Sequence, residues 1–440
     1  MLHSHDMHQY PITPGIRAFL AALSVLLLPL SSAGQPQSAN PTRGLVLVSR
    51  EQAIELALQR NQSLRAQRLA IDQSRANEVT AGLKPNPVVT SSNADFPVFA
   101  PSQLTLSNAA NNQTFTQSVS YLFERGSKRE RRVQVARDTT EVTARGVDDA
   151  ERQLRFQVGQ AFINVLLARA NLALAEDDLN DFAQVVDLSR RRATQGDIAE
   201  GDYLKIALQK LQFEQDVSAA QVALVQGKAA LRQLLGYESV AEDFDVAGDL
   251  THQAATVTLE ALQREATAAR PDLRASRANT KLAGSTVDLA RANRVRDITW
   301  EAEYDRNGPV NGIGVGLSFE LPVHDRNQGE IARSQAAVRQ AQQAESATQV
   351  AVLTDVVNAY AALRTNEQVV SLYESGYLEQ ARQSREISRY AYTRGATALL
   401  DLLDAERTYR ATQLAYRQAL AAHMTSVEQI NFVVGKQVIQ

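Results

Sequence analysis

The sequence predicts a mainly α-helical protein with a small β part, built from one pattern that occurs twice. Two stretches, about 128–194 and 329–394, are rich in Ala, Leu, Gln and Arg and contain no proline, which favours long helices. Two pairs of shorter segments alternate apolar and polar residues, as strands do. Landmarks of the first half have counterparts in the same order in the second half, which indicates an internal repeat.

Four pairs of matching segments define this repeat. We therefore divide the chain into a first repeat, 50–248, and a second repeat, 249–440, and expect one fold for both. The pairs are RNQSLRAQ (60–67) with ARPDLRAS (269–276), SYLFERGSKRERR (120–132) with SFELPVHDRNQGEIAR (318–333), QGDIAEGDYL (195–204) with RGATALLDLL (394–403), and LRQLLG (231–236) with INFVVG (430–435).

Residues 1–33 have the features of a secretory signal peptide. A polar leader with Arg17 precedes the apolar run 18–30, and the small residues at 31–33 suit cleavage. A retained membrane anchor is the alternative, but an anchor needs about 20 apolar residues and this run is shorter. We therefore expect export, with residues 34–49 as a segment before the first repeat.

Composition limits how an exported chain of this kind is stabilised. It has no cysteine, so packing or assembly must replace disulfides, and lipidation on a cysteine near the cleavage site is excluded. No later segment has the roughly 18 uninterrupted apolar residues of a transmembrane helix, so a membrane location would require a β-barrel. The net charge of −3 argues against nucleic acid as a partner.

Each repeat is predicted to contain three helices. The first is of moderate length, 50–83 and 259–296, and is rich in helix-forming residues. The second is the long helix, about 100 Å at 1.5 Å per residue, with apolar residues every three or four positions. The third, 199–235 and 398–432, returns along it. Helices of that length must pack against others along their whole length.

Each repeat also contains a predicted β-hairpin. In the second hairpin, 298–321, Trp300 and Tyr304 alternate with acidic residues, and Asn307-Gly308-Pro309 supplies a turn. The first hairpin, 87–123, has a weaker signal of the same form. Its apolar faces would contain Val88, Ala94, Phe96 and Val98 on one strand and Phe115, Val119, Tyr121 and Phe123 on the other.

The strand alternation is typical of a membrane β-barrel, with an apolar face toward lipid and a polar face toward the lumen. A soluble hairpin covered by helices is the alternative. Four strands cannot close a barrel, and open edges in lipid would leave backbone groups unpaired. Two chains would give a filled lumen, whereas three give a channel. We expect a trimeric 12-stranded outer-membrane barrel, four strands per chain, continued by a long periplasmic α-helical barrel.

Three motifs lie where a strand meets a helix, and each contains proline or glycine, as an abrupt turn requires. They are Pro85-Asn86-Pro87, FERGSKR at 123–129, and LPVHDRNQGE at 321–330. With the order of elements, they resemble the TolC-like outer-membrane efflux family over essentially the whole mature chain, and within it the cobalt-zinc-cadmium (CzcC-like) heavy-metal branch. The chain departs from the usual paired glycine by having Arg125-Gly126.

The resemblance implies a passive homotrimeric channel in outer-membrane lipid. Its partners would be a periplasmic membrane-fusion (adaptor) protein and an inner-membrane RND-type proton-driven pump. It also implies a closed aperture at the helix ends remote from the barrel. The family's basic partner falls at Thr397, with Arg394 as a possible substitute. The aperture positions are Asp202, Tyr392, Asp401 and Asp404.

Two features of the aperture follow from spacing. Asp401 and Asp404 are three residues apart and share a helix face, so three copies would form acidic rings that favour cations. The alternative is that they are ordinary acids at a helix N-terminus, stabilised by the helix dipole. Gly196 and Gly395 each follow a long helix and suit a C-cap where the chain reverses, at the tips that would dock the adaptor.

Alternation also predicts an acidic lumen. If Trp300 and Tyr304 face lipid, the acids between them face the channel. The alternative is that these acids sit near the loop end in bulk water. The predicted lumen acids are Glu301, Glu303, Asp305 and, from the neighbouring strand, Glu320.

Signatures of an enzyme, a cofactor site or a bound metal are missing. The glycines at 312, 314 and 316 alternate within a strand and do not open a helix, so they form no phosphate loop. His252, His324 and His423 have no ligand-like spacing. His324 precedes Asp325 at a strand-to-helix corner, which explains the pair without a ligand.

Three functions fit these observations. The favoured one is the outer-membrane channel of a tripartite efflux system that exports divalent heavy-metal cations from a Gram-negative cell. The second keeps the channel and changes the cargo to drugs, organic solutes or a polypeptide secreted by a type I system. The third is a structural periplasmic coiled coil without a pore. The first two share one channel sequence because the pump selects the cargo.

Overall fold

The computed structural model describes residues 47–94, 105, 107 and 113–439. The predicted signal peptide, most of segment 34–49, and Phe96 and Val98 lie outside them. The first half contains β1 (Leu47–Val48), α1 (Arg50–Arg60), α2 (Gln62–Gly82), β2 (Val88–Ala94), β3 (Thr114–Phe123), α4 (Lys128–Gln195), α5 (Glu200–Leu235) and β4 (Asp245–Val246). The second half contains α6 (Leu259–Ala269), α7 (Pro271–Ala292), β5 (Ile298–Asn307), β6 (Val310–Phe319), α8 (Gln328–Leu372), the π-helical segment η2 (Tyr373–Tyr377), α9 (Leu378–Thr393) and α10 (Leu399–Val434).

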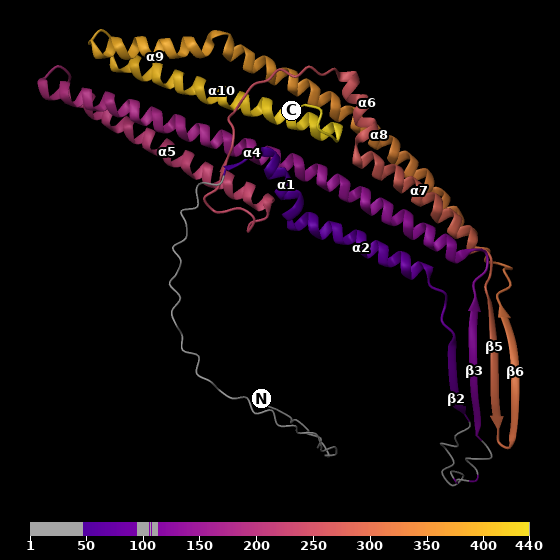
Figure 1. Cartoon of the computed structure of the whole chain (residues 1–440). Coiled ribbons are helices and arrows are strands. Elements are labelled where there is room, and N and C mark those ends of the chain that lie inside the picture. The colour runs from indigo at the N-terminus through magenta and orange to yellow at the C-terminus, as the bar shows by residue number, and fades with distance from the viewer. Residues whose placement is uncertain (1–46, 95–104, 106, 108–112, 440) are drawn as a thin grey trace, which may run out of the picture. The chain divides into compact units, whose positions relative to one another are not determined.

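The four longer strands lie at one end of the helices (Figure 1). In each half two short helices lead into a hairpin, a long helix runs away from it, and a return helix comes part of the way back. With 68 residues, α4 is about 100 Å long. The turn between α4 and α5 is therefore far from the sheet.

The helices predicted over 50–83 and 259–296 are each two helices in the structure, so that prediction was wrong. The chain is extended at Asn61 (φ −61°, ψ 121°) and at Arg270 (φ −65°, ψ 123°). Pro271 is the first residue of α7, and a proline disfavours the helical conformation of the residue before it. The Asn61 side chain accepts a hydrogen bond from the Leu64 amide and so begins a new helix.

Each break contacts the end of the return helix of its own half. Asn61 Nδ2 donates to the carbonyl of Leu234 at 3.0 Å, and Arg270 Nη1 donates to the carbonyl of Val433 at 3.4 Å. These pairs occupy matching positions in the aligned repeat segments. Different side chains therefore satisfy the same C-terminal carbonyl in both halves, which a helix end otherwise leaves unpaired.

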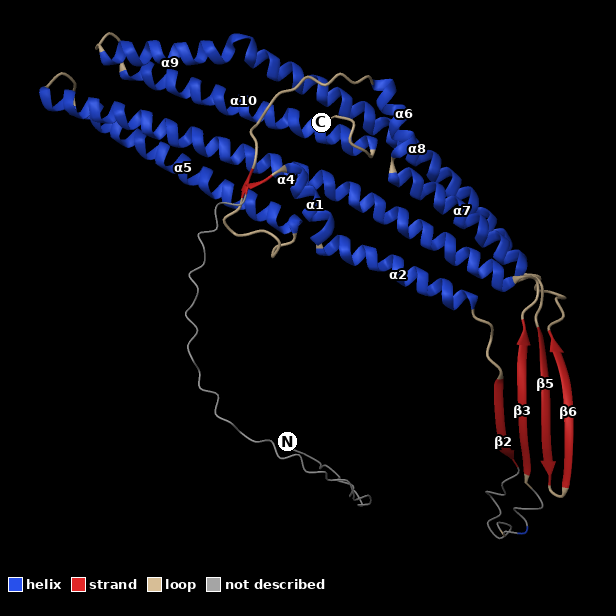
Figure 2. Ribbon diagram, viewed as in Figure 1, coloured by secondary structure: helices blue, strands red, loops and turns tan. Residues whose placement is uncertain are grey.

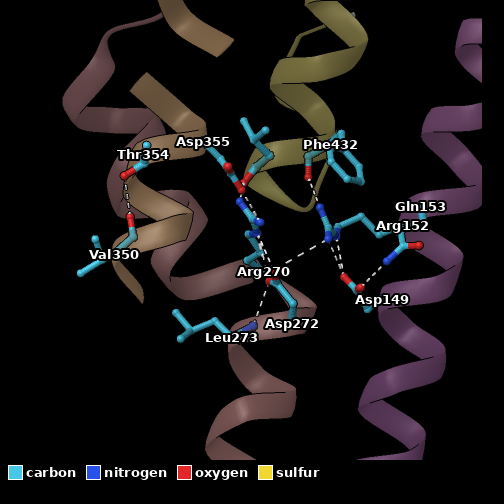
Figure 3. Close-up of polar contacts among 11 residues, drawn as sticks. Asp149, Arg152, Gln153, Arg270, Asp272, Leu273, Val350, Thr354, Asp355 and Phe432 are labelled. Carbon is cyan, nitrogen blue, oxygen red and sulfur yellow. Dashed lines mark hydrogen bonds and ion pairs between the residues drawn. The ribbon is translucent and has the colours of Figure 1, made fainter. Parts of the chain in front are cut away.

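Arg152 of α4 joins the two halves at this level (Figure 3). It donates to the Phe432 carbonyl at 2.9 Å, stacks on the Phe432 ring and pairs with Asp149 at 2.6 Å. Beside it, Arg270 pairs with Asp272 at 3.0 Å and with Asp355 at 2.6 Å. Both arginines are less than a tenth exposed, so their charges are matched by these carboxylates and carbonyls.

The second long helix is interrupted, although the sequence predicted one continuous helix over 329–394. Between α8 and α9 lies the π-helical turn Tyr373–Tyr377, in which Gly376 has a φ of 134°. Residues with a Cβ rarely adopt this φ, so glycine permits the turn.

One 18-residue stretch of α4 has a mean hydropathy of 1.4 and passes a length and composition test for a membrane-crossing helix. In the protomer, α4 buries Val158, Phe162 and Val165 to 3% exposure or less, within the core formed with α1 and α5. Packing between helices accounts for its apolar composition.

The longer strands form one antiparallel sheet in the order β2-β3-β5-β6 (Figure 2). Ten residue pairs join β3 to β5, so the hairpins of the two halves share one sheet. Strands β2 and β6 are its edges.

The register separates two faces. Trp300 lies between Tyr121 and Leu317, and Ala302 lies between Val119 and Val315, which makes an apolar face. The apolar face expected for β2 was assigned to the wrong residues. Val88 pairs with Ser120 and Ala94 with Thr114 on the opposite, polar face, whereas Val89 pairs with Val119. Val88 and Val89 are adjacent and both apolar, so alternation could not distinguish their faces.

Replacing Gly435 with alanine should destabilise the junction between α10 and the helix break. Gly435 has a φ of 83°, and a Cβ there would lie 3.0 Å from Arg270 Cα. We expect a loss of about 2 kcal/mol, against about 1 kcal/mol for Gly248→Ala, where φ is 100° but no atom lies within 4 Å of the added Cβ. Chemical unfolding monitored by circular dichroism measures the free energy of unfolding of both variants. Equal losses of stability would contradict the argument that the close contact with Arg270 makes the Gly435 variant less stable.

Candidate functional site

The polar face of the sheet carries a row of acids. Each acid lies between a hydroxyl residue of β3 and a glycine of β6, and the three are spaced by two residues along β5. The rows are Ser120, Glu301 and Gly316; Ser118, Glu303 and Gly314; and Thr116, Asp305 and Gly312.

Gly312 of β6 leaves room for an acid of β5. A Cβ at Gly312 would overlap the Asp305 carboxylate, and one at Gly314 would lie 3.8 Å from Glu303 Cβ. The three glycines thus lie on the polar face of β6, and they alternate within a strand, as the sequence predicted.

Glu320 differs from the other predicted lumen acids. It lies just after β6 ends, and its Oε2 pairs with Arg296 Nη1 at 3.2 Å. The same arginine pairs with Asp325 at 3.4 Å. The exposed Asp325 carboxylate has a lowered pKa, because the Asn327 amide and Arg296 stabilise its charged form. Glu320 therefore sits at the helical end of the sheet beside a cation.

The strand-to-helix motifs hold the sheet to the helices. Asp297 accepts from the Arg125 amide at 2.9 Å and pairs with the buried Lys128 at 2.7 Å. Ser127 and Asn327, which precede α4 and α8, both have left-handed conformations, with φ of 56° and 59°. Matching motifs of the two halves thus make matching turns.

The tips of the helices reverse at glycines. Gly196 is the left-handed C-cap of α4, with φ 82°, and Gly395 follows α9 with φ 70°. A Cβ at Gly196 would meet no atom within 4 Å, whereas one at Gly395 would lie 3.3 Å from Arg192. The left-handed backbone conformation, rather than a lack of space, therefore requires glycine at these two positions.

The aspartates expected at the aperture make local contacts in the protomer. Asp401 Oδ2 accepts from Thr397 Oγ1 at 2.6 Å and from the Ala398 amide at 3.3 Å, which caps the start of α10. Asp202 pairs with Lys205 on its own helix at 3.2 Å, and Asp404 is exposed. Within the described contacts, none of these carboxylates touches another.

Tyr392 is buried inside the protomer, at 5% exposure. Its hydroxyl lies 3.2 Å from Ser189 Oγ of α4, and its carbonyl accepts from Arg192 at 3.1 Å. It joins a core with Phe182 and Leu402. Tyr392 thus connects α9 to α4. Ser189, its partner, carries no motif in the sequence and was not predicted.

Two histidines meet in the structure. The rings of His252 and His423 lie 4.8 Å apart, edge to face. Burial lowers the pKa of His423, and nearby His252 adds to the shift, so His423 is neutral at pH 7. In the described part of the chain, no group of three or more His, Cys, Asp or Glu residues is placed to hold a metal ion.

An apolar sheet face, an acidic face, two edge strands and a helix of about 100 Å are together typical of a membrane channel protein with an attached helical region. The chain belongs to the outer membrane efflux protein family, whose model matches residues 53–237 and 262–436. The family predicted from the sequence motifs is therefore confirmed.

Curated relatives agree with this assignment. The cobalt-zinc-cadmium resistance protein CzcC of Cupriavidus metallidurans is 25% identical over 391 residues, 88% of this chain and 90% of its own length. Nodulation protein T of Rhizobium leguminosarum bv. trifolii is 23% identical over 74% of this chain and 72% of its own length.

Solved structures share the fold. CusC, described as forming a transmembrane channel, matches with a TM-score of 0.71 at 18% identity, over 91% of this chain and 96% of its own. The Campylobacter jejuni CmeC outer membrane channel matches with a TM-score of 0.74 at 14% identity, over 89% and 87%. At these low sequence identities, the similarity between this chain and the solved structures shows a shared fold.

Asp401→Ala should loosen the first turn of α10, because it removes the acceptor for the Thr397 hydroxyl and the Ala398 amide. We expect local stability to fall by about 1 kcal/mol, the usual cost of losing a helix cap. Amide hydrogen exchange across 399–405 measures this loss. Asp404→Ala is the matched control, and equal effects would show that Asp401 has no special capping role.

Proposed function

We propose that three copies of this chain form an outer-membrane channel that exports divalent heavy-metal cations from a Gram-negative cell. The channel works in a tripartite system with a periplasmic adaptor protein and an inner-membrane RND-type proton-driven pump. The observation that carries the proposal is the four-stranded sheet, with one apolar face, one acidic face and two unpaired edges.

The sheet supports a trimer through its edges. Strands β2 and β6 each pair on one side only in the protomer, and backbone groups left unpaired in lipid cost several kcal/mol each. Pairing β6 of one copy with β2 of the next satisfies both edges and closes the barrel. Three copies supply twelve strands, which leave room for a lumen.

The helices support the same assembly. One side of α5 carries two groups of exposed apolar residues, eleven residues or three helical turns apart, and α9 exposes Ile387 and Tyr390, at 68% and 64%. A helical barrel of three copies would cover such rows. The α5 row is Leu204, Leu208, Leu211, Val222 and Val225, exposed by 52% to 71%.

The proposed cargo rests on the acidic face of the sheet and on sequence similarity to a metal-resistance protein. Glu301, Glu303 and Asp305 would line the lumen of the closed barrel, where rings of acids favour cations. The relative that matches over nine-tenths of its length is named for cobalt, zinc and cadmium resistance. Glu320, beside Arg296, contributes less charge at the periplasmic end of the barrel.

The helical tips would serve as the aperture and the adaptor contact. The reversals at Gly196 and Gly395 are remote from the sheet, and we assign adaptor docking to them. Asp202 and Asp401 lie in the first turns after these reversals, and Asp404 lies in the second turn of α10. Tyr392 would act from within the protomer, by holding α9 against α4.

The assembly should migrate as a heat-resistant trimer in mild detergent, and its helical contact can be tested at Val225. Val225→Glu places a charge in the exposed apolar row and should weaken the trimer. Gln226→Glu, at the next and equally exposed position, should leave it intact. Light scattering gives the mass, and a monodisperse monomer of the unaltered chain would contradict the trimer.

The triple variant Glu301→Gln, Glu303→Gln, Asp305→Asn should lower the cation-to-anion permeability ratio of the channel in planar bilayers, because it removes nine lumen charges per trimer. Reversal potentials in a salt gradient measure the ratio. Glu320→Gln should change it less, because Arg296 already compensates that acid. An unchanged ratio in an intact trimeric triple variant would overturn the acidic lumen.

A further inference from the structure

A buried acid lies where the α4/α5 hairpin meets the α9/α10 hairpin. Asp178 of α4 is 6% exposed, and its Oδ2 accepts no hydrogen bond within the described residues. A buried carboxylate without a partner is costly, so the group must find a cation or bind a proton. Neither the aperture nor the acidic sheet face includes it.

Three of the arginines around Asp178 pair with other acids, and the fourth, Arg417 of α10, donates to the carbonyl and the side chain of Gln413. Arg385 and Arg389 of α9 lie 3.5 Å and 3.3 Å from the Asp181 carboxylate. Arg410 of α10 pairs with Asp216 of α5. The Asp178 carboxylate is left without a salt bridge in the described contacts.

Acids and bases from four helices surround Asp178. The acids on α4 are Asp177, Asp178 and Asp181, with Asp216 on α5 and Glu406 on α10. The bases are Arg385 and Arg389 on α9 and Arg410 and Arg417 on α10, where Tyr409 stacks with Arg385. Asp177 is exposed, so solvent screens its charge, whereas Asp178 is buried and has no ion pair within the described contacts.

The proton belongs on Asp178. Burial raises the pKa of Asp178 to about 6, and the nearby Glu406 carboxylate adds to the shift. Burial also raises the pKa of Glu406. A cavity of about 220 Å³, whose lining includes Asn171, Asp178 and Arg410, lies beside the carboxyl and is large enough to hold water.

We propose that Asp178 is a proton-binding site that couples the contact between the two helical hairpins to the pH of the surrounding compartment. Protonated Asp178 brings no charge into the buried contact. Ionised Asp178 adds an unpaired charge and repels Glu406, which loosens α4 from α10. The site would make the distal part of the helical region more mobile at neutral pH than at acidic pH.

The direction follows from linkage. The carboxyl titrates near its ordinary pKa when the contact is open and near 6 when the contact is closed. Below both values the closed contact has its full stability, and the stability falls as the pH rises toward 6 and then stays constant. A difference of two pKa units corresponds to about a hundredfold change in the opening equilibrium.

Hydrogen exchange on the intact, full-length assembly tests the proposal without reference to transport. Peptides covering α4 near Asp178 and α10 near Glu406 are followed from pH 4.5 to 7.5, with exchange corrected for its chemical pH dependence. We expect the opening equilibrium to rise by tenfold or more with a midpoint near 6. Peptides of the sheet end should show no such change.

Asp178→Asn should remove this pH dependence and keep the protection of the acidic state. Asp177→Asn, the exposed neighbour on the same helix, should keep both the amplitude and the midpoint. A wild-type chain without pH-dependent opening, or an Asp178→Asn variant that retains it, would overturn the proposal.

If Asp178→Asn does not assemble, the variant Glu406→Gln provides the test. Loss of its charge should move the midpoint to lower pH, and an unchanged midpoint would refute the assignment to Asp178.

Discussion

The structure depends on one repeated contact, in which the break between two short helices binds the end of a return helix. Asn61 and Arg270 donate to the carbonyls of Leu234 and Val433, groups that have no partner within their own helix. The glycine that follows, Gly236 or Gly435, has a positive φ and packs directly on the break. Each return helix ends at this contact, and from there toward the sheet α2 packs along α4 and α7 packs along α8.

The same repeat brings the two hairpins into one sheet. Strands β3 and β5 come from different halves and pair over ten residues, so the acids of β5 stand beside the hydroxyl residues of β3 rather than beside other acids. On the other side, Gly312 of β6 gives Asp305 the space that it needs. Charge is thereby concentrated in one row per protomer, while the opposite face remains apolar. A single register produces both surfaces, because side chains alternate along every strand.

Much of this was predictable from the sequence because it depends on local periodicity. The clear alternation over 298–319 gave the correct faces of β5 and β6, and the left-handed turns at Gly196 and Gly395 follow from glycine at the ends of long helices. The break at Asn61 was missed because an asparagine within a helical pattern is a weak signal, although the Pro271 of the other half was a stronger one. The contacts of Asp178 and of Tyr392 with Ser189 link residues on different helices, and periodicity within one helix carries no information on such pairs.

Stability is unevenly distributed along the helical region. At the sheet end, the buried Lys128 pairs with Asp297, and left-handed turns at Ser127 and Asn327 fix the direction of both long helices. At the end remote from the sheet, the α4/α5 and α9/α10 hairpins share a small core around Phe182 and Tyr392. This core lies next to the cluster in which Asp178 lacks a counter-ion. Fewer apolar contacts and a buried carboxylate without an ion pair both lower the free energy of local opening. The distal hairpins, to which we assign the aperture, are therefore the part of the protomer with the weaker internal support, whereas ion pairs and left-handed turns support the sheet end.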